Sequence, residues 1–418
     1  MTDVLALAER MWRGEAQYHP FRGAGSWCEV GDGIASVHAF SNVNGIATDE
    51  GLVLVDTGMA LLADVMHDAI REWSASPLHT AVFTHGHVDH VFGVDRYEAD
   101  NAAMDAAPPR VVAHELVPTR FDRYRLTAGY NGRINQRQFS LPSMDWPVDY
   151  RYPDETYRHD LHLVVGGRRF ELHHNRGETD DHTWVWMPDD KVLLTGDLFI
   201  WASPNCGNPQ KVQRYPREWA VALRTMAGLG AETLLPGHGL PILGADRVRQ
   251  ALSESAELLE VLHDETLAMM NAGATLDEIV HTVHAPAHLL ERPYLRPVYD
   301  EPEFIVRNVW RLYGGWFDGN PARLKPPSDA ALAAEVSTLS GGAAALAERA
   351  VAVADAGDLR LAGQLAEWAA QAAPDDAAVR AVLADVYSRR VDEASSTMAK
   401  GIFRWAADRP GPNDRETT

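Results

Sequence analysis

Short apolar runs separated by turns rich in Gly and Asp dominate the chain from about Gly31 to Gly244. Short apolar runs bounded by turn residues are typical of β-strands. The strands expected from this pattern cover 34–39, 46–48, 52–56, 111–113, 161–165, 169–174, 183–187, 192–195 and 232–235. Helical spacing over 60–73 and 218–229 predicts two helices among them. Two strand-rich halves with helices between them predict an α/β fold, in which two packed sheets carry helices on the outside.

Helical spacing replaces this pattern after about Ala245. Helices are expected over 247–270, 275–283 and 303–317. Thr275 with Glu278 three residues later is the pattern of a capping box. The segment 330–408 is rich in Ala and almost entirely helical by pattern, and 346–387 within it resembles a tetratricopeptide-type helical pair. One such unit cannot bury its apolar face alone, so we expect it to pack on the strand-rich domain before residue 245 or on another subunit.

Composition and charge narrow the classes of function. The 418 residues include 38 Lys and Arg against 59 Asp and Glu, a formal net charge of −21. Such a surface repels phosphate backbones, so no nucleic-acid partner is expected. Cys28 and Cys206 are the only cysteines, which argues against a disulfide framework or a thiolate zinc cluster. The N-terminus is a poor signal peptide and no long apolar run occurs, so we expect a cytoplasmic protein without a membrane span.

The segment 84–90 reads THGHVDH and places four potential metal ligands within six residues: His85, His87, Asp89 and His90. It follows the apolar run 81–83, the expected end of a buried strand. The first two imidazoles aim at one point and the Asp-His pair aims at a second point nearby, as a two-metal site requires. The chain has 18 histidines, but chance clustering rarely produces this order directly after a strand. We therefore interpret the segment as half of a dinuclear metal site.

The order of elements resembles the metallo-β-lactamase superfamily, whose dinuclear hydrolases carry H-x-H-x-D-H after an early strand. Its later ligand positions fall here on RGET, TGD and PGHG, at 176–179, 195–197 and 236–239. The resemblance implies metal site one from His85, His87 and Glu178, site two from Asp89, His90 and His238, and Asp197 as the bridge. Asp56, in the turn 55–58, would hydrogen-bond a ligand imidazole.

Glu178 departs from the superfamily pattern, which has histidine at that position. The alternative is that Glu178 is a surface carboxylate and that His174 or His182 binds the metal instead. Oxygen and imidazole ligands with few cysteines suit two Zn²⁺ ions, with Mn²⁺ or Fe²⁺ as alternatives.

Glutamate at this position is a feature of the alkylsulfatases of the metallo-β-lactamase fold, and similarity to them covers roughly residues 20–405. The most specific element is the run GWFDGNP at 315–321, which looks like the signature before that family's helical dimerisation region. The resemblance implies a metallo-β-lactamase sandwich followed by a tetratricopeptide-like dimerisation domain, and hence a homodimer. The expected domains are a metallo-β-lactamase-fold catalytic domain at 1–245, a helical extension at 246–325, an α-helical dimerisation domain at 326–408 and a tail at 409–418. No counterpart of the family's C-terminal sterol-carrier-like domain is expected.

Other departures bear on the substrate. The alkylsulfatases carry glutamate at the bridging position, where this chain has Asp197. Their two sulfate-contacting elements fall on 208–211 and 303–305, which lack the expected arginine and histidine. Lys211, Arg214 or Arg133 could substitute for these contacts. The residues expected at the substrate are Tyr130, Lys211, Arg214 and Phe304, with Asp89 and Tyr130 as catalytic candidates. For Tyr130, a packed loop aromatic is an equally good interpretation.

Two bound metals imply a metal-bridged hydroxide as nucleophile, because the pKa of a bridging water falls towards about 7. The first hypothesis is therefore a dinuclear zinc hydrolase that cleaves the sulfate ester of a small alkyl molecule. The alternative is a carboxylic ester, lactone or thioester hydrolase, which the missing sulfate contacts favour. A third interpretation is a helical assembly protein with a vestigial sheet domain, and the intact set of candidate ligands argues against it.

Overall fold

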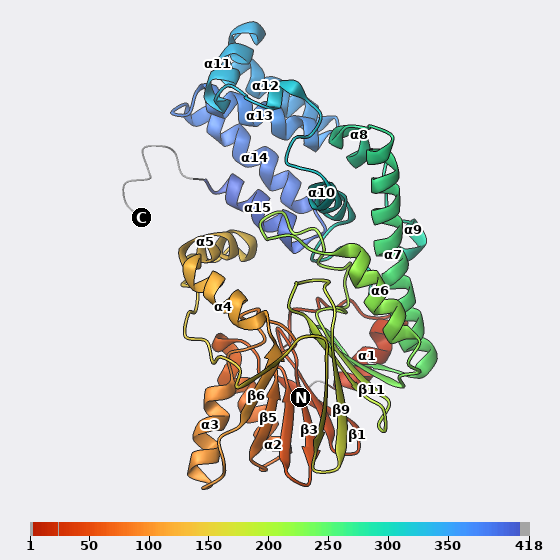
Figure 1. Cartoon of the computed structure of the whole chain (residues 1–418). Coiled ribbons are helices and arrows are strands. Elements are labelled where there is room, and N and C mark those ends of the chain that lie inside the picture. The colour runs from red at the N-terminus through yellow and green to blue at the C-terminus, as the bar shows by residue number, and fades with distance from the viewer. Residues whose placement is uncertain (1–2, 24, 410–418) are drawn as a thin grey trace. The chain divides into compact units, whose positions relative to one another are not determined.

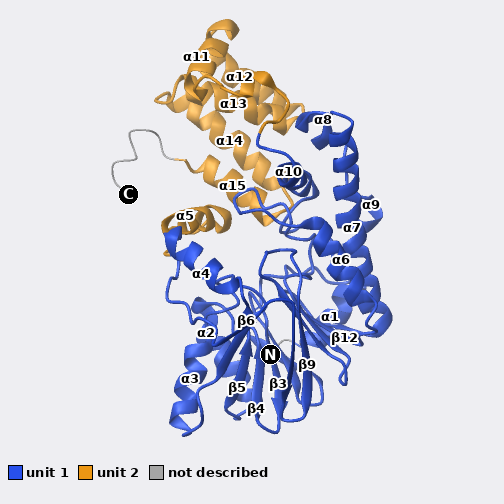
Figure 2. Cartoon of the chain, in the orientation of Figure 1, with its two compact units in different colours: residues 1–128, 146–316 blue, residues 129–145, 317–418 orange. Residues whose placement is uncertain are grey.

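The structure is a computed structural model that describes residues 3–23 and 25–409. The chain divides into two compact units (Figure 1 and Figure 2). The sheet unit consists of residues 1–128 and 146–316, and the helical unit consists of residues 129–145 and 317–418. The expected domain boundaries at 245 and 325 stay predictions. The expected tail at 409–418 lies outside the described residues except for Arg409.

The first sheet of the sheet unit has seven strands, and its strand order follows the sequence from β1 to β7. Strands β1 to β4 form an antiparallel meander, and β4 to β7 are parallel. The strands are β1 (Ser26–Gly31), β2 (Ile34–His38), β3 (Val43–Thr48), β4 (Gly51–Val55), β5 (Leu78–Val82), β6 (Arg110–His114) and β7 (Glu155–Tyr157). Apolar runs such as GLVLV in β4 are buried along their whole length, as strands covered on both faces must be.

The second sheet has six strands in the order β13-β12-β11-β10-β9-β8. Only β11 and β12 are parallel neighbours in it. The strands are β8 (Asp160–Val165), β9 (Arg168–His174), β10 (Thr183–Met187), β11 (Val192–Gly196), β12 (Thr233–Pro236) and β13 (Ile242–Leu243). One apolar core takes side chains from both sheets, among them Val53 and Val82 from the first and Leu172 and Leu194 from the second. The two sheets therefore pack face to face.

Helices cover the outer faces of this sandwich. The helices of the sheet unit are α1 (Val4–Trp12), α2 (Ala63–Trp73), α3 (Val94–Ala103), α4 (Val117–Leu126), α6 (Pro216–Ala227), α7 (Ala245–Asn271), α8 (Leu276–Val280), α9 (Ala287–Leu290) and α10 (Pro302–Tyr313), with a short 3₁₀ helix η1 (Ala60–Leu62). In α7, Leu252, Leu258, Leu259 and Leu262 are fully buried in a second core shared with α6 and α10, and Val261 is half-buried. The capping box predicted at Thr275 is present. The predicted α/β sandwich is confirmed.

Between residues 317 and 409 the helical unit contains five α-helices, and its Ala-rich pattern predicted that this segment is almost entirely helical. They are α11 (Asp329–Ser340), α12 (Ala343–Asp355), α13 (Leu359–Ala372), α14 (Ala377–Glu393) and α15 (Thr397–Ala407), preceded by the 3₁₀ helix η2 (Pro321–Arg323). The turns 356–358 and 374–376 hold the N-caps of α13 and α14, where Asp358 and Asp376 accept backbone N–H groups. Such caps satisfy donors that the first helical turn leaves without partners.

The sequence pattern did not predict that α5 (Ala128–Phe139) belongs to the helical unit. This helix follows α4 in the sequence, between β6 and β7, but packs on α15. The backbone of Gly401 approaches α5 so closely that an added Cβ would lie 2.1 Å from the Gln138 carbonyl oxygen. Arg137 stacks on the Trp405 ring, 4.1 Å from its centroid. Pairing between segments more than 250 residues apart leaves no local signal in the sequence.

No single helix among residues 3–23 and 25–409 is long and apolar enough to cross a membrane. The pair α11 and α12 passes the same length and composition test only when taken together, and the two are bent by 85°.

Candidate metal centre

Each segment with a candidate ligand directly follows a strand of the sandwich. His85 and its neighbours follow β5, Glu178 follows β9, Asp197 follows β11 and His238 follows β12. The strands are rigid and the loops after them can adopt irregular conformations, which is why functional side chains gather at strand ends. The structure brings all seven predicted ligands into two neighbouring groups.

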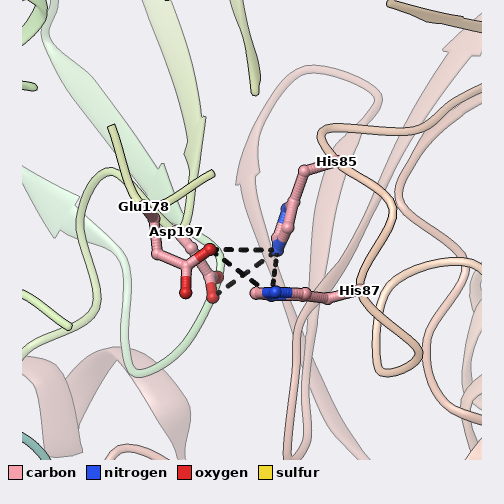
Figure 3. A group of neighbouring side chains, drawn as sticks. All are labelled: His85, His87, Glu178 and Asp197. Carbon is pink, nitrogen blue, oxygen red and sulfur yellow. Dashed lines mark hydrogen bonds and ion pairs between the residues drawn. The ribbon is translucent and has the colours of Figure 1, made fainter. Parts of the chain in front are cut away.

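The first group consists of His85, His87, Glu178 and Asp197 (Figure 3). His85 Nε2 lies 2.8 Å from His87 Nδ1 and 3.8 Å from Glu178 Oε2. Glu178 Oε2 lies 3.4 Å from His87 Nδ1, and Asp197 Oδ2 lies 3.8 Å from His85 Nε2. All four ligand atoms lie within 4.8 Å of one another. Donor atoms at these spacings can surround one ion bound at about 2.0–2.2 Å.

The second group consists of Asp89, His90 and His238. Asp89 Oδ2 lies 3.6 Å from His90 Nε2 and 3.5 Å from His238 Nε2. Asp197 Oδ1 lies 3.3 Å from His90 Nε2 and 3.2 Å from His238 Nε2. Asp197 thus directs one carboxylate oxygen at each group, which is the arrangement of a bridging ligand.

The donor atoms themselves fit divalent cations. Three buried side-chain atoms in the two groups have no hydrogen-bond partner: His90 Nε2, Glu178 Oε2 and Asp197 Oδ1. Buried polar atoms are rarely left unpaired, and all three point into the groups. Burial lowers the pKa of His85 and of His87 well below the usual range, which leaves both imidazoles neutral and able to bind a metal. The residues therefore support divalent metal binding.

The charges within the second group are strongly coupled. Burial works against a charged His90, but the carboxylates of Asp197, Asp89 and Asp56 raise the pKa of His90 well above its usual range. Burial likewise opposes ionisation of Asp197, yet His238 and His90 hold the pKa of this carboxyl well below its usual range. A proton on His90 thus supplies the positive charge that a bound metal cation would supply.

Asp56 lies where the sequence placed it, beside a ligand imidazole. His90 Nδ1 donates to Asp56 Oδ2 at 2.8 Å, which leaves His90 Nε2 directed at the second group. The Thr84 backbone N–H donates to Asp56 Oδ1 at 2.7 Å. Asp56 has φ 60°, a strained conformation for a residue with a Cβ. These hydrogen bonds hold the strained residue in place and orient both the imidazole and the start of the ligand loop.

The two histidines considered as alternatives to Glu178 have other contacts. His174 stacks on His114 with ring centroids 3.6 Å apart, and its Nδ1 bonds to the His182 carbonyl oxygen. His182 Nε2 accepts the backbone N–H of Asp197 at 3.0 Å. Neither belongs to the two groups of converging ligand atoms found among the described residues. The geometry therefore favours Glu178, which is fully buried and not a surface carboxylate.

The cations expected at the substrate lie in different surroundings. Arg214 is buried, and its Nη1 contacts both the Oε1 and the backbone oxygen of Glu178. Its guanidinium is thus engaged by a candidate ligand, and a contact with substrate stays a prediction. Lys211 is half-buried, with its Nζ 5.4 Å from the centroid of the Trp146 ring. Burial, together with the charge of Arg214, lowers the pKa of Lys211 to about 7.

The two aromatic residues expected at the substrate lie in different units. Phe304 is half-buried near the start of α10 in the sheet unit. Tyr130 lies on α5 in the helical unit and is 65% exposed. Contacts of both residues with substrate stay predictions, as does a catalytic role for Tyr130.

Two further residues support the ligand loops and were missed by sequence analysis. Asp181 accepts the Gly86 backbone N–H at 3.1 Å and Arg120 Nε at 2.7 Å, which holds the loop between His85 and His87. Asn205 Nδ2 donates to Glu178 Oε1 at 2.8 Å. Neither residue has a distinctive sequence spacing, because both reach the site through contacts formed only on folding.

Comparison with known proteins agrees with this geometry. Residues 39–238 match the metallo-beta-lactamase superfamily, and residues 275–410 match the alkyl sulfatase dimerisation family. A linear primary-alkylsulfatase from a Pseudomonas species is 27% identical over 372 residues, covering 82% of this chain and 69% of that protein. An (R)-specific secondary-alkylsulfatase from Pseudomonas sp. is 26% identical over 397 residues, covering 88% of this chain and 59% of that protein. An alkyl/aryl-sulfatase from Saccharomyces cerevisiae is 24% identical, and the match covers 96% of this chain and 66% of that protein. The chain thus spans between 59% and 69% of the length of these relatives.

A solved structure shares the fold over most of the chain. The stereoselective inverting sec-alkylsulfatase Pisa1 from Pseudomonas sp. superposes with a TM-score of 0.81 at 24% identity. The match covers 93% of this chain and 66% of that chain. The predicted order, a two-sheet sandwich followed by a helical domain, is therefore confirmed at the level of the fold.

Asp300 generates a prediction about stability and pH. It is fully buried and accepts the backbone N–H groups of Gly207 at 2.5 Å and Glu301 at 2.7 Å, so it anchors the loop that contains Asn205 and Arg214. Burial raises the pKa of Asp300 to about 7. The unfolded value is about 4, so the folded protein binds more protons between these pH values. The stability contributed by Asp300 is therefore present at low pH and is lost as pH rises through about 7.

We expect the unfolding free energy of the native protein, relative to the Asp300→Asn variant, to fall as pH rises from about 4 to about 7. Urea unfolding of both proteins at equal metal content measures this difference. Asp189→Asn is the control, because Arg169 holds the pKa of that exposed carboxyl below its usual range and the relative stability should not fall over the same interval. A difference for Asp300→Asn that does not change with pH would contradict the prediction.

Proposed function

Because this chain carries a metallo-β-lactamase superfamily domain followed by an alkyl sulfatase dimerisation domain, we propose that it is a metal-dependent hydrolase of small alkyl sulfate esters. The observation that supports this most directly is the pair of ligand groups bridged by Asp197. The alkylsulfatases among its relatives make the sulfate ester the first candidate substrate. We propose two Zn²⁺ as the metals, because imidazole and carboxylate ligands suit this ion.

The side chains divide the tasks of the proposed reaction. His85, His87 and Glu178 would hold one cation, Asp89, His90 and His238 the other, and Asp197 both. Two bound cations supply Lewis-acid chemistry, since they lower the pKa of a coordinated water and stabilise negative charge on the ester oxygens. The remaining requirements, which are access for the substrate, transfer of a proton and recognition of an anion, fall to the protein.

Access to the centre is on the side of His87 and Asp89. Their side chains are 17% and 18% exposed, whereas the other five ligands are at most 6% exposed. A substrate therefore reaches the centre past these two residues. The Asp89 carboxylate, on the open side, is placed to accept a proton from the attacking water.

Lys211 is the cation we propose for anion recognition. The charges of Asp89 and Glu178 both act on its ammonium group, which indicates that it lies near the open side of the centre. A protonated Lys211 would offset the charge of a sulfate group brought to a site that already contains three carboxylates. It would do so from the position next to Gln210, on which the arginine of the alkylsulfatase pattern falls.

The alternative substrate class is a carboxylic ester, lactone or thioester. The sequence favours it at one point, because the segment 303–305 lacks the second sulfate contact expected of an alkylsulfatase. The same two metal groups would serve either reaction, so the choice rests on the substrate test below.

We expect the metal-loaded protein to release inorganic sulfate from a medium-chain alkyl sulfate such as octyl sulfate. Treatment with a chelator and the His87→Ala change should each lower the rate by at least about 100-fold, because both remove the first cation. His281→Ala is the control and should keep full activity, since His281 is an exposed residue on the loop after α8. The proposal fails if no sulfate is released and lactones or thioesters are hydrolysed in a reaction that His87→Ala abolishes.

We expect Lys211→Met to raise KM for the alkyl sulfate by about 10-fold, because one charge-assisted contact is worth roughly that factor. In the native protein KM should also rise as pH increases above about 7, where Lys211 loses its proton, and the variant should lack this rise. Steady-state kinetics from pH 6 to 8.5 measure both effects, with Lys191→Met as an exposed-lysine control. An unchanged KM would remove Lys211 from the substrate site.

We also propose that the chain forms a homodimer through its helical unit. This unit exposes several large apolar side chains, including Leu332, Leu339 and Leu361, at 43%, 80% and 47%. Light scattering at micromolar concentration should give about twice the chain mass of 46.1 kDa. A mass equal to one chain would contradict the proposal.

A further inference from the structure

Glu178 is held by two side chains of the loop 201–215. The carboxylate is fully buried, and its Oε1 accepts from both Asn205 Nδ2, at 2.8 Å, and Arg214 Nη1. Arg214 Nη1 also donates to the backbone oxygen of Glu178. One guanidinium therefore binds both the side chain and the backbone of Glu178.

The other carboxylate oxygen is left free for the metal. Glu178 Oε2 has no hydrogen-bond partner and lies 3.4 Å from His87 Nδ1. With Oε1 engaged by Asn205 and Arg214, only Oε2 is available as a ligand atom. Two donors on one oxygen thus orient the carboxylate as a ligand through a single oxygen.

The backbone of Arg214 is itself held by hydrogen bonds to a residue of α10. The Asn308 side chain bonds to both backbone groups of Arg214, accepting its N–H at 3.4 Å and donating to its carbonyl oxygen at 3.2 Å. Gln213 Nε2 donates to the same Asn308 side chain at 2.6 Å. Arg214 is also 98% buried, so its charge acts on Glu178 with little screening by water.

Because both charges are buried, Glu178 needs Arg214 as a partner and Arg214 needs Glu178. A lone carboxylate with no exposure to water would be costly, and so would a lone guanidinium. Imidazoles such as His85 and His87 bind a metal in their neutral form, so Glu178 is the only carboxylate that belongs to the first group alone. Arg214 cancels that charge at a distance that leaves Oε2 free.

We propose that Arg214 and Asn205 are positioning residues for Glu178. Together they fix it as a ligand through one oxygen, and Arg214 makes the Glu178–Arg214 pair equivalent in charge to a neutral ligand. The inference rests on the proposed metal centre. Its test measures metal binding and not sulfate release. The inference can therefore fail while the hydrolase proposal stands.

We expect Arg214→Met to bind one of two Zn²⁺ ions about 10- to 100-fold more weakly, with the second ion little affected, because only the first group loses support for a ligand. Arg214→Lys should retain part of the affinity, since lysine keeps the charge but not the forked geometry. Asn205→Ala should weaken the same ion by about 5-fold, the worth of one hydrogen bond. Competition with a chromogenic chelator measures both affinities on the full chain.

The decisive variant is Glu178→His combined with Arg214→Met. An imidazole is a neutral ligand and needs no compensating charge, so the double variant should bind the first ion more tightly than Arg214→Met alone. Arg71→Met is the matched control, because it removes a largely buried arginine from an ion pair with Asp100, away from the centre, and should bind both ions normally.

Two results would overturn the proposal. One is that Arg214→Met binds two Zn²⁺ ions tightly while circular dichroism shows that it is folded. The other is a double variant that binds metal as poorly as Arg214→Met, which would mean that Arg214 supports the fold and not the charge of Glu178. If Arg214→Met does not fold, Asn205→Ala and Arg214→Lys decide the question, and unchanged affinity in both would be equally negative.

Discussion

The burial of charge at the ends of the strands is the constraint on which the sheet unit depends. Three carboxylates and four imidazoles lie within a few ångströms of one another, and five of these seven side chains are buried. Such a cluster repels itself unless positive charge is supplied. Arg214 supplies part of it beside Glu178, and without a metal a proton on His90 supplies more, as the raised pKa of His90 shows. The conformations of the loops around the cluster follow from this requirement for positive charge.

The supporting residues follow from the same constraint. Asp56 orients His90, Asp181 with Arg120 holds the loop of His85 and His87, and Arg214 with Asn205 holds Glu178. Each support comes from a different strand end or loop, so none of these four ligands depends on its own segment alone. Hydrogen bonds of this kind set which atom of each side chain faces the metal.

The chain adds a helical unit whose described residues do not contribute to this cluster of ligands. Ser or Asp caps α11, α13, α14 and α15, and these helices are rich in alanine and at most 17 residues long, so much of their stability must come from packing and not from intrinsic propensity. The insertion of α5 joins the chain between β6 and β7 to this unit. The two units are therefore linked by three crossings of the backbone.

Much of the fold was predictable from local pattern. Strands such as β10 and β11 are apolar runs bounded by turns, and α7 has a clear apolar stripe, so burial of each element follows from its own residues. Among the elements that the pattern missed are α4, α5 and the edge strand β1, which are more polar and whose positions depend on what they pack against.

The sequence by itself determined which side chains are candidates for the metal centre, because the H-x-H-x-D-H order and the residues after each strand have a recognisable spacing. It left open whether Glu178, His174 or His182 completes the first group. Only the tertiary structure brings Glu178, and not His174 or His182, into the first group of converging side chains, and places Arg214 on that carboxylate and not in solvent. The physical reason is that spacing along a chain specifies which residues follow a strand, whereas the partner of a buried charge is set by contacts between segments distant in sequence.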